Sequence, residues 1–110
     1  MRGEIWNANL APTRGHEQDG SRPVLIVSTD DFNASPAELV IVVPITSKNK
    51  SIRSHVPVGP GGKSGLKSKS YIMAEQPRTI STERLSKRIG KVDDNVLADV
   101  GYVLRVLLEL

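Results

Sequence analysis

The 110-residue sequence contains no cysteine. Disulfide scaffolds, cysteine-based zinc sites and thiol catalysis are therefore excluded. Aromatic residues are scarce, with one Trp, one Phe and two Tyr. The core must therefore be built mainly from Val, Ile and Leu. The aromatic surface on which RNA-recognition and cold-shock domains stack bases is also missing.

Long apolar runs are absent too. No stretch approaches the roughly 18 residues that a helix needs to span a bilayer, and the first residues lack the apolar run of a secretory signal peptide. We therefore expect a protein of the reducing cytoplasm that has no membrane partner. The length fits one domain over residues 1–110 and leaves no room for a second.

No residue pattern predicts a metal site or a cofactor site. His16 and His55 are far apart in the sequence, and neither has a ligand-like spacing to a pair of acids. Adjacent acids at 30–31 and 93–94 precede expected helices, where helix capping explains them. P-loop and dinucleotide-binding fingerprints are missing. We expect neither a metal nor a cofactor.

Acidic residues are missing from one long stretch of a chain whose net charge is +3: none lies between Glu38 and Glu75. The same stretch carries the cations Lys48, Lys50, Arg53, Lys63, Lys67 and Lys69. These side chains could follow a nucleic-acid backbone, which would make binding sensitive to salt. A merely soluble loop is the other interpretation, and both stay open.

Short apolar runs separated by turn signals predict a β-rich domain. The expected strands cover residues 5–10, 22–28, 38–46, 55–58, 71–74, 78–80 and 87–92. The run 24–27 is apolar on both faces, which indicates a central, buried strand. Pro44 donates no backbone hydrogen bond, so it predicts a bulge or a sheet edge just before Thr46. A Gly-rich loop is expected to be flexible over residues 59–70.

The C-terminal segment has helical rather than strand periodicity. Its apolar residues are Val96, Leu97, Val100, Val103, Leu104, Leu107 and Leu108. We expect Asp93 to cap this amphipathic helix, and Val92 and Leu97 to form a hydrophobic staple. Gly101 would let a neighbouring group approach the helix closely.

Two shorter helical turns are expected, one capped by Asp30 or Asp31 and ending at Ala34, the other over residues 82–85. About seven short strands and one long helix give a mainly β fold with helices, of the α+β class. The pattern predicts a small, strongly bent barrel or SH3-like sheet on which the C-terminal helix packs.

Residues 15–23, between the first two expected strands, gather chemically active side chains. They are His16, Glu17, Gln18, Asp19 and Arg22. Gly15 and Gly20 give the backbone freedom to fold over a ligand, and Arg22 lies where a rigid strand can fix its guanidinium. The alternative is a solvated hairpin loop in which Arg22 pairs with Glu17 or Asp19.

Two further polar groups follow expected strands. Thr46 and Ser47 end the strongest strand, where two hydroxyls could donate to a phosphate oxygen, although a routine strand terminus has the same composition. Glu75, Gln76 and Arg78 follow the strand at 71–74. There a Gln or an Arg could read a base edge or hold a phosphate, and the alternative is a simple turn.

Together these segments resemble the MazF/PemK (Kid) family of toxin endoribonucleases over almost the whole chain. The resemblance is carried by Gly3-Glu4-Ile5-Trp6, Pro12, Gly15, Glu17-Gln18, Gly20, Arg22-Pro23-Val24-Leu25-Ile26-Val27, Pro44-Ile45-Thr46-Ser47, Glu75-Gln76-Pro77-Arg78-Thr79-Ile80 and the terminal helix. Each piece is unspecific alone, but the order and spacing are specific. The resemblance implies an SH3-like β-barrel that forms a homodimer. It implies cleavage of single-stranded RNA, usually messenger RNA, at a short sequence, and a MazE-like antitoxin that blocks the RNA groove.

The resemblance also assigns roles to individual positions. The family arginine falls on Arg22, and the family Thr or Ser falls on Thr46. Met73 stands where some PemK-like members carry an arginine that works with the strand-end acid. Glu75 provides the acid at that strand end. The role of the missing arginine is therefore expected to fall to Arg22.

A metal-free mechanism follows, because RNA carries its own nucleophile, the 2′-OH. Its attack on the adjacent phosphorus leaves a 2′,3′-cyclic phosphate and a 5′-OH end. Arg22 would stabilise the charged phosphorane, with proton donation as its second role, and Thr46 would hold a non-bridging oxygen. Glu17 is the candidate base or orienting acid, and His16 is the alternative. The expected RNA contacts are Gln18, Ser47, Lys48, Lys50, Arg53, Glu75, Gln76 and Arg78.

Two other functions compete with this hypothesis. A non-catalytic toxin of the same fold, like the CcdB gyrase poisons, would act through a protein surface on the terminal helix. It would not need the pair Arg22 and Thr46. A plain RNA-binding SH3-like module would bind through Arg22 and cut nothing. The order of the motifs favours the ribonuclease.

Overall fold

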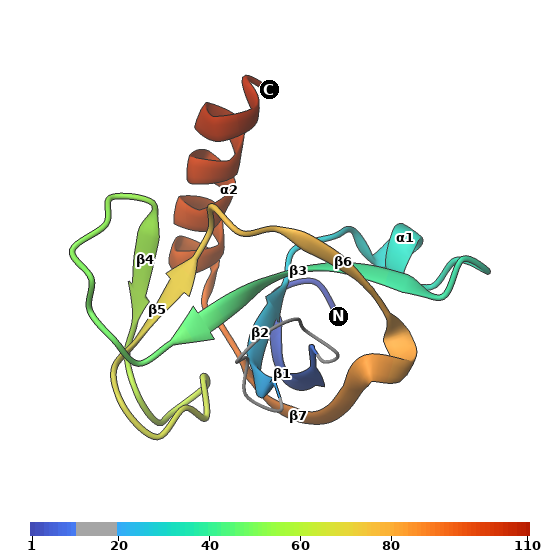
Figure 1. Cartoon of the computed structure of the whole chain (residues 1–110), viewed down its shortest axis with the longest axis horizontal. Coiled ribbons are helices and arrows are strands. Elements are labelled where there is room, and N and C mark those ends of the chain that lie inside the picture. Colours follow the sequence, from blue (N-terminus) through green and yellow to red (C-terminus); the bar gives the residue numbers. More distant parts are fainter. Residues whose placement is uncertain (11–19) are drawn as a thin grey trace.

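The structure, a computed structural model, describes residues 1–10 and 20–110. This described part contains seven β-strands, two α-helices and one short 3-10 helix (Figure 1). The strands are β1 (Glu4–Asn9), β2 (Ser21–Ile26), β3 (Leu39–Thr46), β4 (His55–Val58), β5 (Ser70–Met73), β6 (Arg78–Ser81) and β7 (Leu85–Lys91). The helices are α1 (Asp30–Asn33), the 3-10 helix η1 (Thr82–Arg84) and α2 (Asp94–Leu108). Every strand predicted from the sequence is confirmed, with ends shifted by at most two residues.

The strands form one antiparallel, strongly bent sheet in the order β4-β5-β3-β2-β1-β7. β6 also pairs with β3, so the neighbour of β3 changes along its length. β6 pairs with Leu39 to Val42, whereas β5 pairs with Ile45 and Thr46. Pro44 lies at this change because it has no N–H to donate. The predicted bulge or sheet edge just before Thr46 is wrong in form, because β3 is continuous, pairs Pro44 with Val24 of β2 without a register shift, and only changes its other neighbour from β6 to β5 there.

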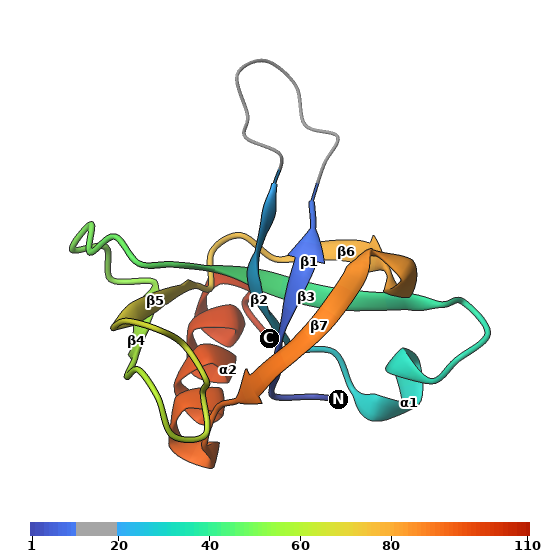
Figure 2. The same cartoon turned by 90° about the horizontal axis from the view of Figure 1, so that it is seen from below.

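Two hydrophobic clusters pack on the two faces of β2. Leu25 belongs to the first cluster together with Val100 of α2, whereas Val24 and Ile26 belong to the second. Side chains alternate between the faces of a strand, so the prediction that this run is buried on both faces is confirmed. Figures 1 and 2 both place α2 beside β4 and β5, where it covers the first cluster.

The helix caps separate a confirmed prediction from a wrong one. Asp93 caps α2, because its Oδ1 accepts the backbone N–H three residues on at 3.0 Å. In α1 the cap is Thr29, whose Oγ1 accepts the N–H of Phe32 at 3.4 Å. The prediction of Asp30 or Asp31 as the cap is wrong. Both acids lie in the first helical turn, where their negative charges interact favourably with the positive end of the helix dipole.

Gly101 does not serve close packing within the described part of the chain. A Cβ atom built at this position would meet nothing within 4 Å, so the predicted close approach is wrong there. In the ranges 1–10 and 20–110, no helix is both long and apolar enough to cross a membrane.

Candidate functional site

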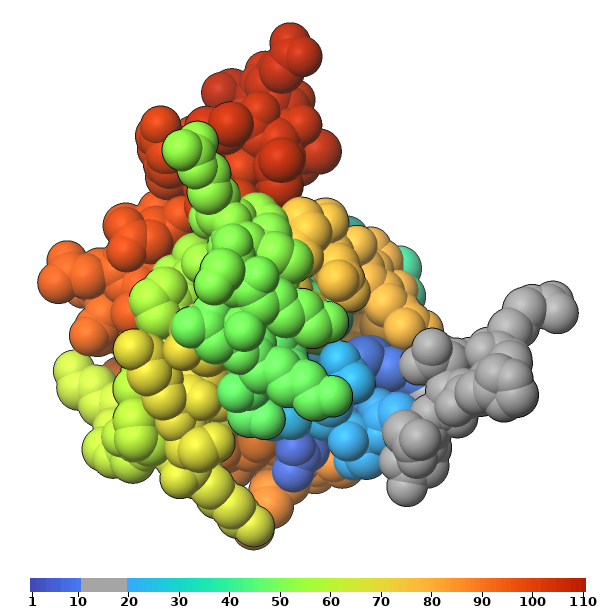
Figure 3. Space-filling view, turned by 60° about the vertical axis from the view of Figure 1, so that its left-hand side comes forward, coloured from blue at the N-terminus to red at the C-terminus, as the bar shows by residue number. Residues whose placement is uncertain are grey.

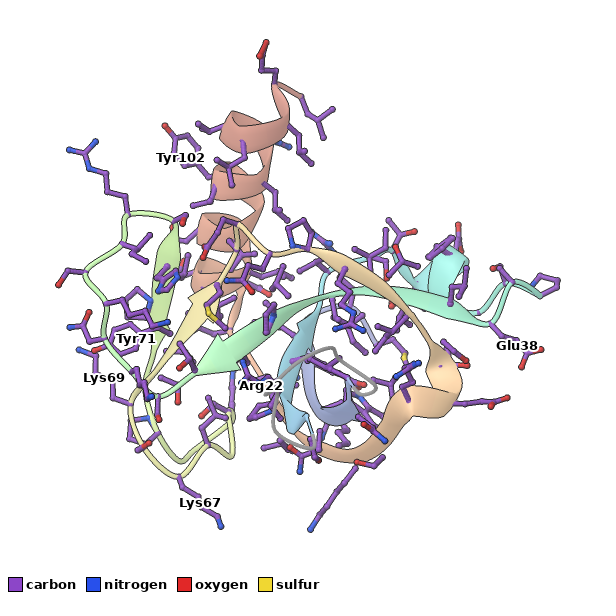
Figure 4. All side chains as sticks on the ribbon, in the orientation of Figure 1. Arg22, Glu38, Lys67, Lys69, Tyr71 and Tyr102 are labelled. Atoms are coloured by element: carbon purple, nitrogen blue, oxygen red, sulfur yellow. The ribbon has the colours of Figure 1, made fainter. Side chains whose placement is uncertain are left out.

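Arg22 and Thr46 are brought together by the pairing of β2 with β3. The antiparallel register sets Val24 opposite Pro44. Continued outward by two residues, this register sets Arg22 opposite Thr46. Both residues line one cleft of about 730 Å³. Figure 4 shows Arg22 between β2 and the end of β3.

Cations line this cleft, and no carboxylate does so in the part of the chain that the structure describes. The cations are Arg22, Lys48, Lys67, Lys87 and Arg88, and the neutral polar residues are Asn7, Thr46, Ser47, Ser68 and Ser70. Figure 3 shows the bordering segments meeting, with β2 in blue, the end of β3 in green and residues 65–72 in yellow. A cleft lined by charge of one sign concentrates the field and attracts the opposite charge. The site therefore suits a phosphate-bearing ligand.

The hydroxyl of Thr46 is oriented by the backbone of Lys48. Its Oγ1 accepts the N–H of Lys48 at 3.2 Å. A hydroxyl that accepts one hydrogen bond still carries a hydrogen to donate. Because Thr46 lines the cleft, this hydrogen is available to an anionic oxygen bound there.

Arg88 is held at the cleft by the carboxylate of Glu4, which does not itself line the cleft. Glu4 Oε2 lies 3.2 Å from Arg88 Nε, and Glu4 Oε1 accepts from Trp6 Nε1 at 2.9 Å. Burial raises the pKa of Glu4, but the hydrogen bonds from Trp6 and Arg88 and the N-terminal ammonium lower it more strongly. The pKa of Glu4 lies below its ordinary value, so the carboxylate stays ionised and fixes Arg88.

The segment 63–67, which carries Lys67 at one side of the cleft, packs closely on β7. Lys91 N donates to Lys63 O at 2.8 Å, and a Cβ atom at Gly90 would lie 2.3 Å from that same oxygen. Ser64 Oγ also donates to two carbonyls of its own turn, at 2.8 and 3.0 Å. The loop expected to be flexible over residues 59–70 is therefore hydrogen-bonded and packed. Only glycine at position 90 lets the two backbones approach so closely.

A second polar cluster forms where β5 ends and β4 begins. Ser54 Oγ donates to Glu75 Oε1 at 2.7 Å, and His55 Nε2 lies 2.9 Å from Glu75 Oε2. Gln76 Nε2 is a more distant neighbour of Oε2, at 3.5 Å. Burial raises the pKa of Glu75. The hydrogen bonds from Ser54, from its own backbone and from His55 together lower this pKa by more than burial raises it. The pKa of Glu75 therefore lies below its ordinary value.

The remaining predicted site residues are distributed as follows. Lys50 and Arg53 are exposed on the segment 47–54, which joins the cleft to the Glu75 cluster. Arg78 Nη2 donates to Leu10 O at 3.1 Å, so it holds the chain just after β1. None of Lys50, Arg53, Glu75, Gln76 and Arg78 is among the described residues that line the cleft. The predicted residues His16, Glu17 and Gln18 lie outside the described residues.

Five polar cleft residues were missed by the sequence reasoning: Asn7 on β1, Ser68 and Ser70 just before and at the start of β5, and Lys87 and Arg88 on β7. The adjacent cations of β7 are visible in the sequence, but only the pairing of β7 with β1 brings them to Arg22. Within the described ranges, no group of three His, Cys, Asp or Glu side chains could hold a metal ion.

Comparison with known proteins finds a matching family model and several relatives of this chain. Residues 1–108 match the family model described as PemK-like, MazF-like toxin of type II toxin–antitoxin system. The chain is 37% identical over 113 residues to endoribonuclease MazF9 of Mycobacterium tuberculosis, covering 99% of this chain and 96% of that protein. It is 39% identical over 100 residues to endoribonuclease PemK of Escherichia coli, covering 90% and 74%.

A solved structure shows the same fold. The MazE–MazF structure from Deinococcus radiodurans superposes with a TM-score of 0.81 at 28% identity, covering 99% of this chain and 95% of that one. The predicted SH3-like, strongly bent sheet with a C-terminal helix is thereby confirmed.

Proposed function

The chain belongs to the PemK-like, MazF-like toxin family of type II toxin–antitoxin systems, and from this premise we propose that it is an endoribonuclease that cuts single-stranded RNA without a metal ion. One observation carries the proposal. Arg22 and Thr46 line one cleft whose other charged, described residues are all cations. Such a cleft suits the phosphodiester of RNA.

The RNA supplies the nucleophile in this mechanism. The 2′-OH attacks the adjacent phosphorus, so that a bond forms between O2′ and phosphorus while the bond from phosphorus to O5′ breaks. The products are a 2′,3′-cyclic phosphate and a 5′-OH end. The protein must align the three atoms, stabilise the charge of the phosphorane and move one proton from O2′ and one to O5′.

Arg22 and Thr46 provide the charge stabilisation. The planar guanidinium of Arg22 can donate to two phosphate oxygens at once, which favours the doubly charged phosphorane over the singly charged diester. Thr46 donates its remaining hydroxyl hydrogen to a non-bridging oxygen, since its Oγ1 already accepts from Lys48 N. Arg22 serves secondarily as the proton donor to O5′.

The proton on O2′ goes to Glu17, with His16 as the alternative acceptor. Replacement of Glu17 by Gln should then lower kcat far more than it raises KM. Full activity of Glu17→Gln would remove Glu17 from the mechanism. A loss of activity in His16→Ala in the same assay would assign the role to His16.

The partners follow from the family and from an exposed apolar surface. We infer that one domain over residues 1–110 acts as a cytoplasmic homodimer and is inhibited by a MazE-like antitoxin. The solved Deinococcus radiodurans relative is a MazE–MazF structure. On α2, Tyr102 is 69% exposed and Val106 is 58% exposed, and Figure 4 shows Tyr102 on the outside of the helix. Apolar side chains exposed in this way are typical of protein contact surfaces.

Incubation of a long single-stranded RNA with the protein in excess EDTA tests the function. We expect discrete fragments from the wild-type protein and from Arg105→Ala, which removes an exposed arginine of α2 outside the cleft. Arg22→Ala should leave the RNA intact while keeping its fold. Intact RNA from a folded wild-type protein free of antitoxin would refute the proposal. That result would favour a non-catalytic, CcdB-like toxin that binds DNA gyrase.

A further inference from the structure

The floor of the cleft is a row of residues that crosses four strands. The two registers of β1 set Asn7 opposite Pro23 of β2 on one side and opposite Lys87 of β7 on the other. The β2–β3 register, continued by one residue beyond its last pair, sets Pro23 opposite Ile45. Directly opposed residues share one face of a sheet, and all four residues line the cleft. This cleft floor is therefore apolar at β3 and β2, and polar at β1 and β7.

The two ends of the cleft floor suit two different phosphates. β2 and β1 lie between β3 and β7. Because neighbouring strands are about 4.8 Å apart, the backbones of β3 and β7 are separated by roughly 14 Å along the floor. In the mechanism proposed above, the reacting phosphate lies at the β2–β3 end, with Arg22 and Thr46. Lys87 therefore faces the place of a neighbouring phosphate, and Pro23 lies beneath the nucleoside that links the two.

The polar end of the cleft floor is free to bind a ligand. Among the described residues, neither the amide of Asn7 nor the ammonium of Lys87 has a hydrogen-bond or ion-pair partner. The adjacent cation Arg88 differs, because its Nε lies 3.2 Å from Glu4 Oε2. Glu4 thus compensates the charge of Arg88 and leaves that of Lys87 for a ligand. An Asn amide carries two donor hydrogens, so a phosphate beside Lys87 can also accept from Asn7.

Lys67 adds a further positive charge at the same end of the cleft. The segment that carries Lys67 contacts β7 two residues beyond Lys87, because a Cβ atom at Gly65 would lie 2.2 Å from Ile89 O. Figure 2 shows this segment beside β7. Lys67 is exposed and lines the cleft. The electrostatic potential at this end therefore favours a second anionic group.

We propose that Lys87 and Asn7 bind the phosphate next to the one that is cleaved, so that efficient cleavage requires a second phosphodiester beside the cut. The inference rests on the ribonuclease function proposed above and deepens it, since it assigns a second binding site to the same cleft. Lys87 supplies the charge, and Asn7 donates from its amide to a non-bridging oxygen. These contacts do not involve the reacting atoms. They therefore lower KM and leave kcat nearly unchanged.

A lysine that is merely solvated would also attract RNA, but it would not select one phosphate. Its attraction is spread over the polyanion and is screened over about 8 Å at physiological ionic strength. A lysine that contacts one phosphate loses its effect when that phosphate alone is neutralised. Changing one phosphate at a time therefore separates the two interpretations.

The test neutralises single phosphates of a short RNA whose cut site has been mapped. Each phosphodiester except the cleaved one is replaced in turn by a methylphosphonate, in which a methyl group replaces one non-bridging oxygen, and the two diastereomers are assayed separately. In the wild-type protein, one replacement directly beside the cut should lower kcat/KM by about 10-fold through a higher KM, the effect of one lost charge-assisted hydrogen bond. In Lys87→Gln the intact RNA should already show this loss, and the same replacement should cost less than about 2-fold.

Matched variants of β1 and β7 separate this contact from the general charge of the protein. Lys87→Arg should keep the effect of the replacement, because a guanidinium also donates to phosphate. Asn7→Ala should reduce the effect at the same phosphate. Lys91→Gln removes an exposed cation of β7 that does not line the cleft, and it should behave as the wild-type protein does. Urea unfolding of each variant reports whether the fold is intact.

A dinucleotide with a single phosphodiester provides a second comparison. It should be a poor substrate for the wild-type protein and an equally poor one for Lys87→Gln, because the second phosphate is missing in both cases. A loss of kcat on this dinucleotide in Lys87→Gln would place Lys87 at the reacting phosphate and overturn the inference.

Two further results would overturn the inference while the ribonuclease stood. One is a wild-type protein in which no single replacement beside the cut has an effect. The other is a replacement that costs Lys87→Gln as much as it costs the wild-type protein. A wild-type protein that cut no RNA would instead refute the function itself.

Discussion

The affinity of the cleft for RNA should depend steeply on salt, because five cations face it: Arg22, Lys48, Lys67, Lys87 and Arg88. Each phosphate neutralised on a single strand contributes about −0.7 to the slope of log K against log salt. If all five bind phosphates, the slope is about −3.5, and affinity falls by about 100-fold between about 50 and 200 mM salt. Lys67→Gln removes one contact and should reduce the slope to about −2.8.

The assay is fluorescence anisotropy of a labelled RNA that carries a 2′-deoxy residue at the cut site, so that binding is measured without cleavage. Lys91→Gln is the matched control, because Lys91 is an exposed cation of β7 that does not line the cleft. Its slope should equal that of the wild-type protein. A slope near zero would refute the reasoning, and so would a slope that changes in Lys91→Gln but not in Lys67→Gln.

The remaining predictions concern stability, measured as the free energy of unfolding in urea. Gly101→Ala should raise it by about 1 kcal/mol, because Ala favours the helix and the added Cβ meets nothing within 4 Å; a decrease would mean that a neighbour occupies that face. Gly90→Ala should lower it by about 1–3 kcal/mol, because the Cβ would lie 2.3 Å from Lys63 O; a neutral result would contradict the close packing of the loop on β7. Asp93→Ala should lower it by about 1 kcal/mol through loss of the α2 cap, and an unchanged value would contradict the cap. Ionised Glu75 stabilises the fold above its ordinary carboxyl pKa of 4.5, and this contribution is lost as the pH falls through the lowered folded pKa. The stability advantage of the wild-type protein over Glu75→Gln should therefore shrink on acidification, and an advantage that grew would contradict the assigned direction.

The strands and the long helix could be predicted because their signals are local. The run around Leu25 is apolar on both faces, Pro44 lacks a donor, and Asp93 precedes an amphipathic segment. Each feature fixes a structural consequence without knowledge of distant residues. The prediction of the α1 cap was wrong because several neighbouring residues give the same local signal. Thr29 and the two acids after it are all good caps, and the choice between them depends on backbone angles that the sequence does not show.

The candidate site could be predicted only in part, because its residues converge through the sheet. Arg22 and Thr46 were found as a pair through the family resemblance, and the β2–β3 register explains why they line the same cleft. Lys87 and Arg88 had no such signal, since their place in the cleft depends on the pairing of β7 with β1. The hydrogen bond between His55 on β4 and Glu75 in the turn after β5 likewise depends on the register of β4 with β5, which is a property of the folded chain.

The central claim is that this chain cuts RNA with the 2′-OH as the nucleophile, and the masses of the fragment ends test it most directly. A short RNA that contains the mapped cut site should yield one fragment with a 2′,3′-cyclic phosphate and one with a 5′-OH. The same RNA with a single 2′-deoxy residue on the 5′ side of the cut should stay intact while it still binds. Cleavage of the deoxy substrate, or fragments with 5′-phosphate ends, would contradict the account.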